Sequence, residues 1–167
     1  MKWKVGEIYK MMEVTKQNEE LILKEQVYKF IIKNVEKINK EIGGILGGYG
    51  HTVTRCCIDK GLGSCKCSYI PDTKYLNQVV ADWVKEDICF LGIFHTHFFN
   101  VTTLSEGDIN YIQKIMDAMP DYIKQLYFPI VSLPEKRLTV YMARKTFGKT
   151  EILKVKSIIQ GERLCLN

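Results

Sequence analysis

The sequence has no long apolar segment of the kind that enters or crosses a membrane. Its longest apolar run covers only residues 88–94, whereas a membrane-spanning helix needs about 18 such residues. The opening stretch MKWKVGEIYKMMEV contains lysines but no apolar core of signal-peptide length. We therefore expect a cytoplasmic protein without a membrane partner.

The chain also lacks concentrated positive charge and the common nucleotide-binding motifs. Its net charge is +5, but the lysines are spread over the whole length, and the basic stripe typical of nucleic-acid-binding domains is absent. The glycine-rich segment EIGGILGGYG at residues 41–50 matches neither G-x-G-x-x-G nor a segment ending in G-K-[ST]. We expect no nucleic-acid partner and no nucleotide loop.

The six cysteines do not form a familiar framework. Without signs of export they are expected to be thiols or metal ligands rather than disulfides. Cys56, Cys57, Cys65 and Cys67 are spaced C-C-x7-C-x-C, which matches no zinc-finger pattern. Small thiols are common in buried strands, so a core role and a second, structural metal site both remain open for these four residues.

With 167 residues, of which 46% are hydrophobic and 26% charged, the chain suits one globular domain covering residues 1–167. Apolar periodicity predicts helices over residues 27–38, 75–84 and 104–119. In the third helix Ile109, Ile112, Met116 and Met119 are expected to face inward, and Pro120 ends it.

Strands are predicted over residues 1–10, 41–50, 88–98 and 151–159. Two further pairs are expected to form hairpins: one within residues 52–70 around a glycine-rich turn, and one from residues 126–133 and 137–143 around Pro134. Interleaved helices and antiparallel strand pairs indicate the α/β (α+β) class, with a sheet covered by helices.

One segment carries a chemical pattern, namely His95-Thr96-His97 followed by Ser105 and Asp108. Side chains of a strand repeat every two residues, so His95 and His97 face the same side and can converge on one ion. Asp108, at the start of the next helix, can add an oxygen ligand. Two nitrogens, one carboxylate and an open position are the ligand set of a catalytic zinc ion, which lowers the pKa of water toward about 7.

Each of these residues also has a structural interpretation. Histidines in a strand can simply be hydrogen-bonded core residues. Ser105 and Asp108 have the S-x-x-D spacing of a helix capping box, although glutamate or glutamine is more usual at the fourth position. The two interpretations of Ser105 and Asp108 are compatible, because the start of a helix holds a ligand firmly.

The joint spacing H-x-H-x7-S-x2-D resembles the signature of the JAB/JAMM (MPN-domain) zinc metallopeptidases. In that family a glutamate lies upstream, and Glu41 before Gly-Gly-Ile-Leu-Gly occupies the matching place. The resemblance extends over about residues 20–145. It departs at Phe98, where the family often has proline. Cytidine deaminases share the architecture, but their H-x-E and P-C-x-x-C motifs are missing here.

The resemblance implies a fold, a cofactor and roles for five residues. The fold would be the MPN fold, a curved, mixed, mostly antiparallel sheet flanked by helices, with a cytidine-deaminase-like architecture. His95, His97 and Asp108 would hold one Zn²⁺ per chain. Glu41 would act as general base on the attacking water, and Ser105 would stabilise the oxyanion.

The resemblance further implies a peptidase or isopeptidase acting on the extended C-terminal tail of a ubiquitin-like or similarly conjugated protein. Such bacterial proteins are associated with E1- and E2-like enzymes, some of them in antiphage systems. Processing the tail of a sulfur-carrier protein is the alternative substrate. A non-catalytic MPN scaffold that binds partners is the alternative from another class.

Overall fold

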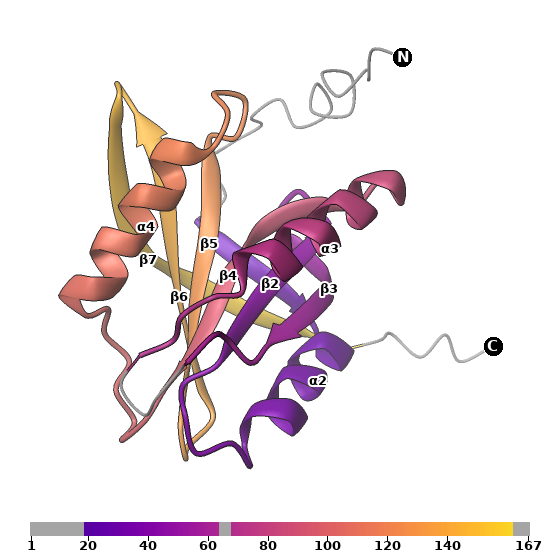
Figure 1. The fold of residues 1–167 in the computed structure, drawn as a ribbon, viewed down its shortest axis with the longest axis vertical. Helices are drawn as coiled ribbons and strands as arrows, with labels where there is room; N and C mark the ends of the chain where they lie inside the picture. Colours follow the sequence, from indigo (N-terminus) through magenta and orange to yellow (C-terminus); the bar gives the residue numbers. More distant parts are fainter. Residues whose placement is uncertain (1–18, 64–67, 162–167) are drawn as a thin grey trace.

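The computed structural model describes residues 19–63 and 68–161. The strand predicted over residues 1–10 lies outside this part, as do Cys65 and Cys67. Ten elements follow one another along the chain (Figure 1): β1 Glu20–Lys24, α2 Glu25–Val35, β2 Gly43–Tyr49, β3 Thr52–Asp59, α3 Thr73–Lys85, β4 Cys89–His97, α4 Glu106–Ala118, β5 Gln125–Ser132, β6 Arg137–Thr146 and β7 Lys149–Gln160.

The seven strands close into a barrel in the order β1-β3-β2-β4-β5-β6-β7. Four strand pairs are antiparallel, whereas β1–β3, β1–β7 and β4–β5 are parallel. A mixed, mostly antiparallel sheet flanked by helices was therefore expected correctly. The expected curved sheet is in fact a closed barrel, because β1 pairs with both β3 and β7 and joins the two ends of the sheet.

The closing strand, β1, was not expected from the sequence. Its five residues, ELILK, run directly into α2, so the strand is too short for its alternation to stand out from the helix that follows. Leu21 and Leu23 are both fully buried. Closure of the barrel therefore depends on a short segment whose partners are remote in sequence.

Two other expectations are met only in part. Of the hairpin expected within residues 52–70, the first strand is β3, which ends at Asp59, whereas residues 64–67 lie outside the described part of the chain and Ser68 forms a single bridge. In α4, Ile112 and Met116 are buried as expected, but Ile109 is half-exposed. Ile109 is absent from the residues that pack on the outer face of the sheet, which include Ile112, Ile115 and Met116.

The core has two parts, one on each face of the sheet. The interior of the barrel, plugged by α2, contains among others Leu21, Ile31, Leu46, Phe94 and Val140. The outer face of β2, β4, β5 and β6 packs under α3 and α4, as Figure 1 shows, and contains among others Ile45, Trp83, Ile93, Met116 and Phe128. Consecutive strand residues such as Ile45 and Leu46 therefore pack on opposite faces of the sheet, because side chains alternate along a strand.

None of the helices in the described part of the chain combines the length and the apolar character needed to cross a lipid bilayer.

Candidate metal centre

The last residues of β4 carry the two histidines on its outer face. Phe94 and Thr96 are fully buried and belong to the barrel side, whereas Ile93 packs with the outer layer. The alternation therefore directs His95 and His97 outward, to the side on which α4 lies. The β4–α4–β5 unit joins two parallel strands, so α4 begins near the carboxyl end of β4, where α/β sheets commonly place ligands.

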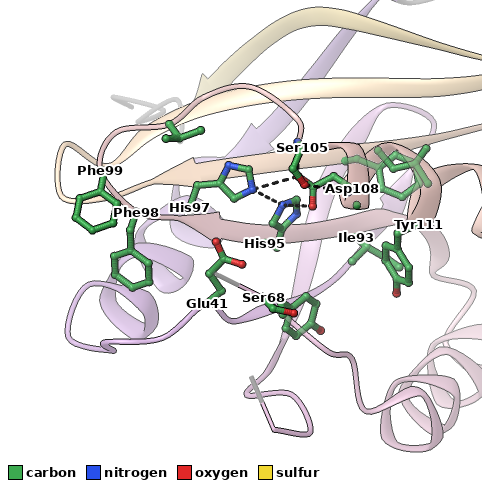
Figure 2. A pocket seen from close by; sticks show the side chains of 15 residues that line it. Glu41, Ser68, Ile93, His95, His97, Phe98, Phe99, Ser105, Asp108 and Tyr111 are labelled. Atoms are coloured by element: carbon green, nitrogen blue, oxygen red, sulfur yellow. Dashed lines mark hydrogen bonds and ion pairs between the residues drawn. The ribbon is translucent and has the colours of Figure 1, made fainter. Parts of the chain in front are cut away.

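Three potential ligand side chains meet at this point, as Figure 2 shows. The Nε2 atoms of His95 and His97 are 2.8 Å apart. Asp108 Oδ1 is 3.2 Å from His95 Nε2, and Asp108 Oδ2 is 3.3 Å from His97 Nε2. Ligand atoms about 2.0–2.1 Å from a tetrahedrally coordinated zinc ion lie about 3.3 Å from one another. The two separations between histidine nitrogen and carboxylate oxygen match this spacing, and the separation of the two nitrogens is about half an ångström shorter.

The chemistry of these three groups also suits a cation. Two imidazole lone pairs and a carboxylate that converge on one point repel one another unless a proton or a metal ion lies between them. His95, His97 and Asp108 are the one group of three or more such side chains within the described ranges 19–63 and 68–161. The residues present therefore fit a divalent metal ion.

Asp108 is held by the start of α4. Ser105 is the N-cap, and its hydroxyl accepts a hydrogen bond from the Asp108 N–H at 3.1 Å. In return Asp108 Oδ2 accepts hydrogen bonds from the Ser105 N–H at 2.7 Å and from its hydroxyl at 2.8 Å. The capping box is thus present, and it orients the carboxylate toward the histidines.

The charge state of Asp108 follows from opposing effects. Burial disfavours its ionised form, but hydrogen bonds with His95 and His97 outweigh burial, so the pKa of Asp108 lies well below its ordinary value. The carboxylate is therefore negative at neutral pH, as a metal ligand must be.

Glu41 reaches the same face through strand pairing. Gly43 pairs with His95 in the antiparallel β2–β4 ladder. The pairing extends one residue further, because the Thr96 N–H donates to Ile42 O at 2.9 Å. The Ile42 N–H donates to Oγ1 of the Thr96 side chain at 3.1 Å. This register sets Glu41 opposite His97, and opposite residues share a face. Figure 2 shows the Glu41 side chain beside the two imidazole rings.

These side chains lie in a pocket of about 420 Å³ that includes Glu41, both histidines, Ser105 and Asp108. Glu41 is only 9% exposed and has no hydrogen bond or ion pair with another residue of the described part of the chain. Burial raises its pKa from 4.5 to about 7; the charge of Asp108 adds to this, and His97 opposes it. A carboxyl with a pKa near neutrality is suited to exchange protons at physiological pH.

Replacement of Glu41 by glutamine is expected to stabilise the metal-free protein in a pH-dependent way. The unfolded chain ionises this group near 4.5 and the folded chain near 7, so Glu41 lowers stability progressively as the pH rises between these values, and fully above them. The gain for Glu41→Gln should be near zero at pH 4.5 and about 1–3 kcal/mol at pH 8. Urea unfolding in the presence of a chelator measures it, and an equal gain at both pH values would contradict the assigned pKa.

The loop between β3 and α3 contributes a wall of the pocket that the sequence did not reveal. Asp59, only 4% exposed, accepts hydrogen bonds from the Tyr69 hydroxyl at 2.7 Å and from the N–H groups of Gly61 and Asp72 at 2.8 Å each. Tyr69 lines the pocket, and a Cβ atom at Gly43 would lie 2.5 Å from its ring. Gly43, two residues after Glu41, therefore makes room for the Tyr69 ring.

The cysteines do not gather around a metal in the described residues. Cys56 and Cys57 are free thiols, and the Cys57 sulfur lies 3.1 Å from the Tyr75 hydroxyl. Burial raises the pKa of Cys56 above its ordinary value, so the free thiol is protonated at neutral pH. Cys65 and Cys67 lie outside the described residues, so the choice between a core role and a second metal site stays open for the four cysteines.

Neither a protein-family model nor a curated protein matches the sequence. Solved structures do. The solution structure of a protein from Desulfitobacterium hafniense superposes with a TM-score of 0.63 at 19% identity, covering 85% of this chain and 94% of that one. The crystal structure of a JAB1/MPN domain protein from Archaeoglobus fulgidus gives a TM-score of 0.48 at 15% identity, covering 83% and 98%. The first likeness shows that this chain and the Desulfitobacterium protein share a fold.

Proposed function

We propose that this protein is a zinc-dependent peptidase or isopeptidase of the JAB/JAMM type. One observation carries the proposal: Glu41, 54 residues away from His95 in sequence, is brought by the β2–β4 register to the pocket in which the ligand atoms of His95, His97 and Asp108 meet. A metal site alone needs only the three ligands. A buried carboxyl with a pKa of about 7 beside them adds the acid–base group that hydrolysis requires.

In this mechanism the metal ligands and Glu41 have separate roles. His95, His97 and Asp108 would hold the zinc ion, which supplies a Lewis acid and lowers the pKa of water at the site. Glu41, as a carboxylate, takes a proton from the attacking water and then passes one to the leaving amine, which would otherwise depart as an unstable anion. The apolar pocket walls limit the water around Glu41 and so strengthen these charge interactions.

For the substrate we propose an amide or isopeptide bond at the extended C-terminal tail of a ubiquitin-like or similarly conjugated protein. E1- and E2-like enzymes would then be functional partners, as in bacterial antiphage conjugation systems. The support is the resemblance of the H-x-H-x7-S-x2-D and Glu41 pattern, together with the pocket of about 420 Å³ that contains these residues. Removal of residues after the Gly-Gly end of a sulfur-carrier protein is the alternative.

Incubation of zinc-loaded protein with ubiquitin-like domains that carry either a C-terminal peptide extension or a lysine-linked isopeptide tests the proposal. Cleavage is expected for one of the two, with products identified by mass spectrometry, and the choice distinguishes peptidase from isopeptidase activity. Cleavage of equal rate by Glu41→Ala would refute the mechanism. Stoichiometric zinc without cleavage of any such substrate would instead support a scaffold.

Ser105→Ala is expected to lower both stability and turnover. The hydroxyl caps α4 and donates to Asp108, so its loss should cost about 1 kcal/mol of unfolding free energy. We also propose that Ser105 stabilises the oxyanion, which predicts a fall in kcat of about 10²- to 10³-fold. In the structure its hydroxyl hydrogen is directed to Asp108, so this role requires a change of partner when substrate binds. A loss of stability with unchanged kcat would leave Ser105 a capping residue only.

A further inference from the structure

An aromatic side chain faces solvent at the edge of the pocket. Phe99 is 83% exposed, yet it belongs to the residues that line the pocket with Glu41 and the two histidines. Figure 2 shows its ring beyond Phe98, on the side of Glu41 and His97 opposite to Tyr111. A single exposed aromatic residue is common on protein surfaces, so its exposure needs a second observation to carry meaning.

That observation is the backbone conformation. Phe99 and Asn100 both have a φ of 56°, and the Val101 N–H donates to Phe98 O at 3.2 Å. This is a tight turn with positive φ at both central residues, as in type I′ turns, where glycine, asparagine and aspartate predominate. Asn100 fits that preference. A bulky residue such as Phe99 rarely adopts positive φ and is strained there.

The turn is fixed to the rest of the molecule rather than free to relax. The Asn100 N–H donates to Leu133 O at 2.9 Å, and Asn100 Oδ1 accepts from the Glu135 N–H at 3.1 Å. The Leu133 N–H in turn donates to His97 O at 2.8 Å. The position of the Phe99 ring is therefore coupled to the backbone of His97. Strained residues of this kind gather at ligand sites, where the surroundings enforce them.

The composition of the pocket indicates what the ring meets. The polar groups Glu41, His95, His97 and Asp108 lie together, and apolar side chains flank them on both sides: Phe98 and Phe99 on one side, and Ile93 and Tyr111 on the other. A polypeptide whose amide lies over the polar group must run along one of these apolar walls. An apolar side chain next to that amide would cover the exposed Phe99 ring and release water from both.

We propose that Phe99 is a specificity-determining residue that selects polypeptide substrates with a large aliphatic or aromatic side chain beside the scissile amide. This proposal rests on the proposed hydrolase function. It adds a substrate class to that function: the preferred tail carries a large apolar residue next to the bond that is cut, instead of small residues throughout.

The chain offers a matched pair of variants. Phe99→Asn removes the ring and places a residue that tolerates positive φ in the turn. Phe147 is fully exposed, with a φ of 48°. It follows Thr146, the last residue of β6. The other end of β6 is the one near the site, because its first residue, Arg137, pairs with Ser132. Phe147→Asn therefore makes the same change at the opposite end of the sheet. Both variants should unfold at or above the temperature of the parent protein.

The probes are fluorescein-labelled peptides of sequence Gly-Gly-X-Gly-Gly, with X being leucine, phenylalanine, glycine or glutamate. Their binding to zinc-loaded Glu41→Gln protein, which should not turn them over, is followed by fluorescence anisotropy. We expect the leucine and phenylalanine peptides to bind about tenfold more tightly than the glycine peptide. This is the size of the affinity gain expected when one apolar side chain enters an apolar site. Adding Phe99→Asn should abolish this preference, and adding Phe147→Asn should preserve it.

Equal binding of the glycine and leucine peptides, no detectable binding of either, or a preference that survives Phe99→Asn would overturn the proposal. These outcomes are separate from failure of the hydrolase function. If the fusion proteins are cleaved but the preference does not depend on Phe99, the function stands and the role of Phe99 falls. If the preference depends on Phe99 but no amide is cleaved, the peptide site stands and the hydrolase assignment falls.

Discussion

Replacement of His97 by alanine is expected to abolish zinc binding and hydrolysis together. His97 is 7% exposed, and its Nε2 lies within 3.3 Å of both His95 Nε2 and Asp108 Oδ2, so its loss removes one of the three converging ligand groups. Loss of an outer-shell partner alone costs up to about 100-fold in metal affinity, and loss of a ligand should cost more. Metal analysis after dialysis should find about one zinc per parent chain and none in the variant.

The chain supplies the control for this experiment. Of its three histidines, His51 lies at the β2–β3 turn beside Glu20 and outside the pocket, so His51→Ala should retain both zinc and activity. Asp108→Asn keeps a side-chain oxygen for the helix cap but loses the negative charge, and it should bind zinc weakly while remaining folded. Stoichiometric zinc in His97→Ala would remove the metal centre from the proposal.

Glu41→Gln should separate zinc binding from turnover. Glutamine preserves the size of the side chain but cannot accept a proton, so kcat should fall by about 10²- to 10⁴-fold, the contribution of a positioned general acid–base group. Zinc content should stay at the parent level, because Glu41 is absent from the group of converging ligand atoms. Steady-state kinetics on the preferred fusion substrate and metal analysis of the same preparation measure the two effects.

Glu36→Gln is the matched control for this variant. Glu36 follows α2 and pairs with Lys136 at 2.6 Å, away from the pocket, so its replacement should leave kcat unchanged. Loss of zinc from Glu41→Gln would make Glu41 a ligand and the assignment of a general base wrong. Unchanged turnover with full zinc would leave the protein without its proposed proton carrier.

Two parts of the candidate site could be predicted from the sequence, because each depends only on the geometry of one strand or one helix. His95 and His97 share a face through the two-residue repeat of a strand, which operates within three residues. Ser105 and Asp108 meet through the first turn of a helix, and the capping box expected from their spacing is present. The helices and most strands were likewise indicated by periodicity. The catalytic roles of these residues remain predictions.

Other features followed from contacts between distant segments. The resemblance pointed to Glu41, but the β2–β4 register is what places it opposite His97, and that register depends on which strands become neighbours. Tyr69 enters the pocket because Asp59 holds its hydroxyl, and nothing in the sequence joins these two residues. The sequence alone shows neither the positive φ of Phe99 nor its exposure to solvent.

The sequence by itself therefore determined the types of the candidate ligands, their spacing along one strand and one helix, and the mixed α/β character of the chain. Tertiary structure decided that the sheet closes into a barrel through β1, which carboxyl is buried beside the histidines, and which aromatic ring stands at the edge of the pocket. The physical reason is range: periodicity and capping act over a few residues, whereas strand pairing and burial arise only when segments remote along the chain are packed together.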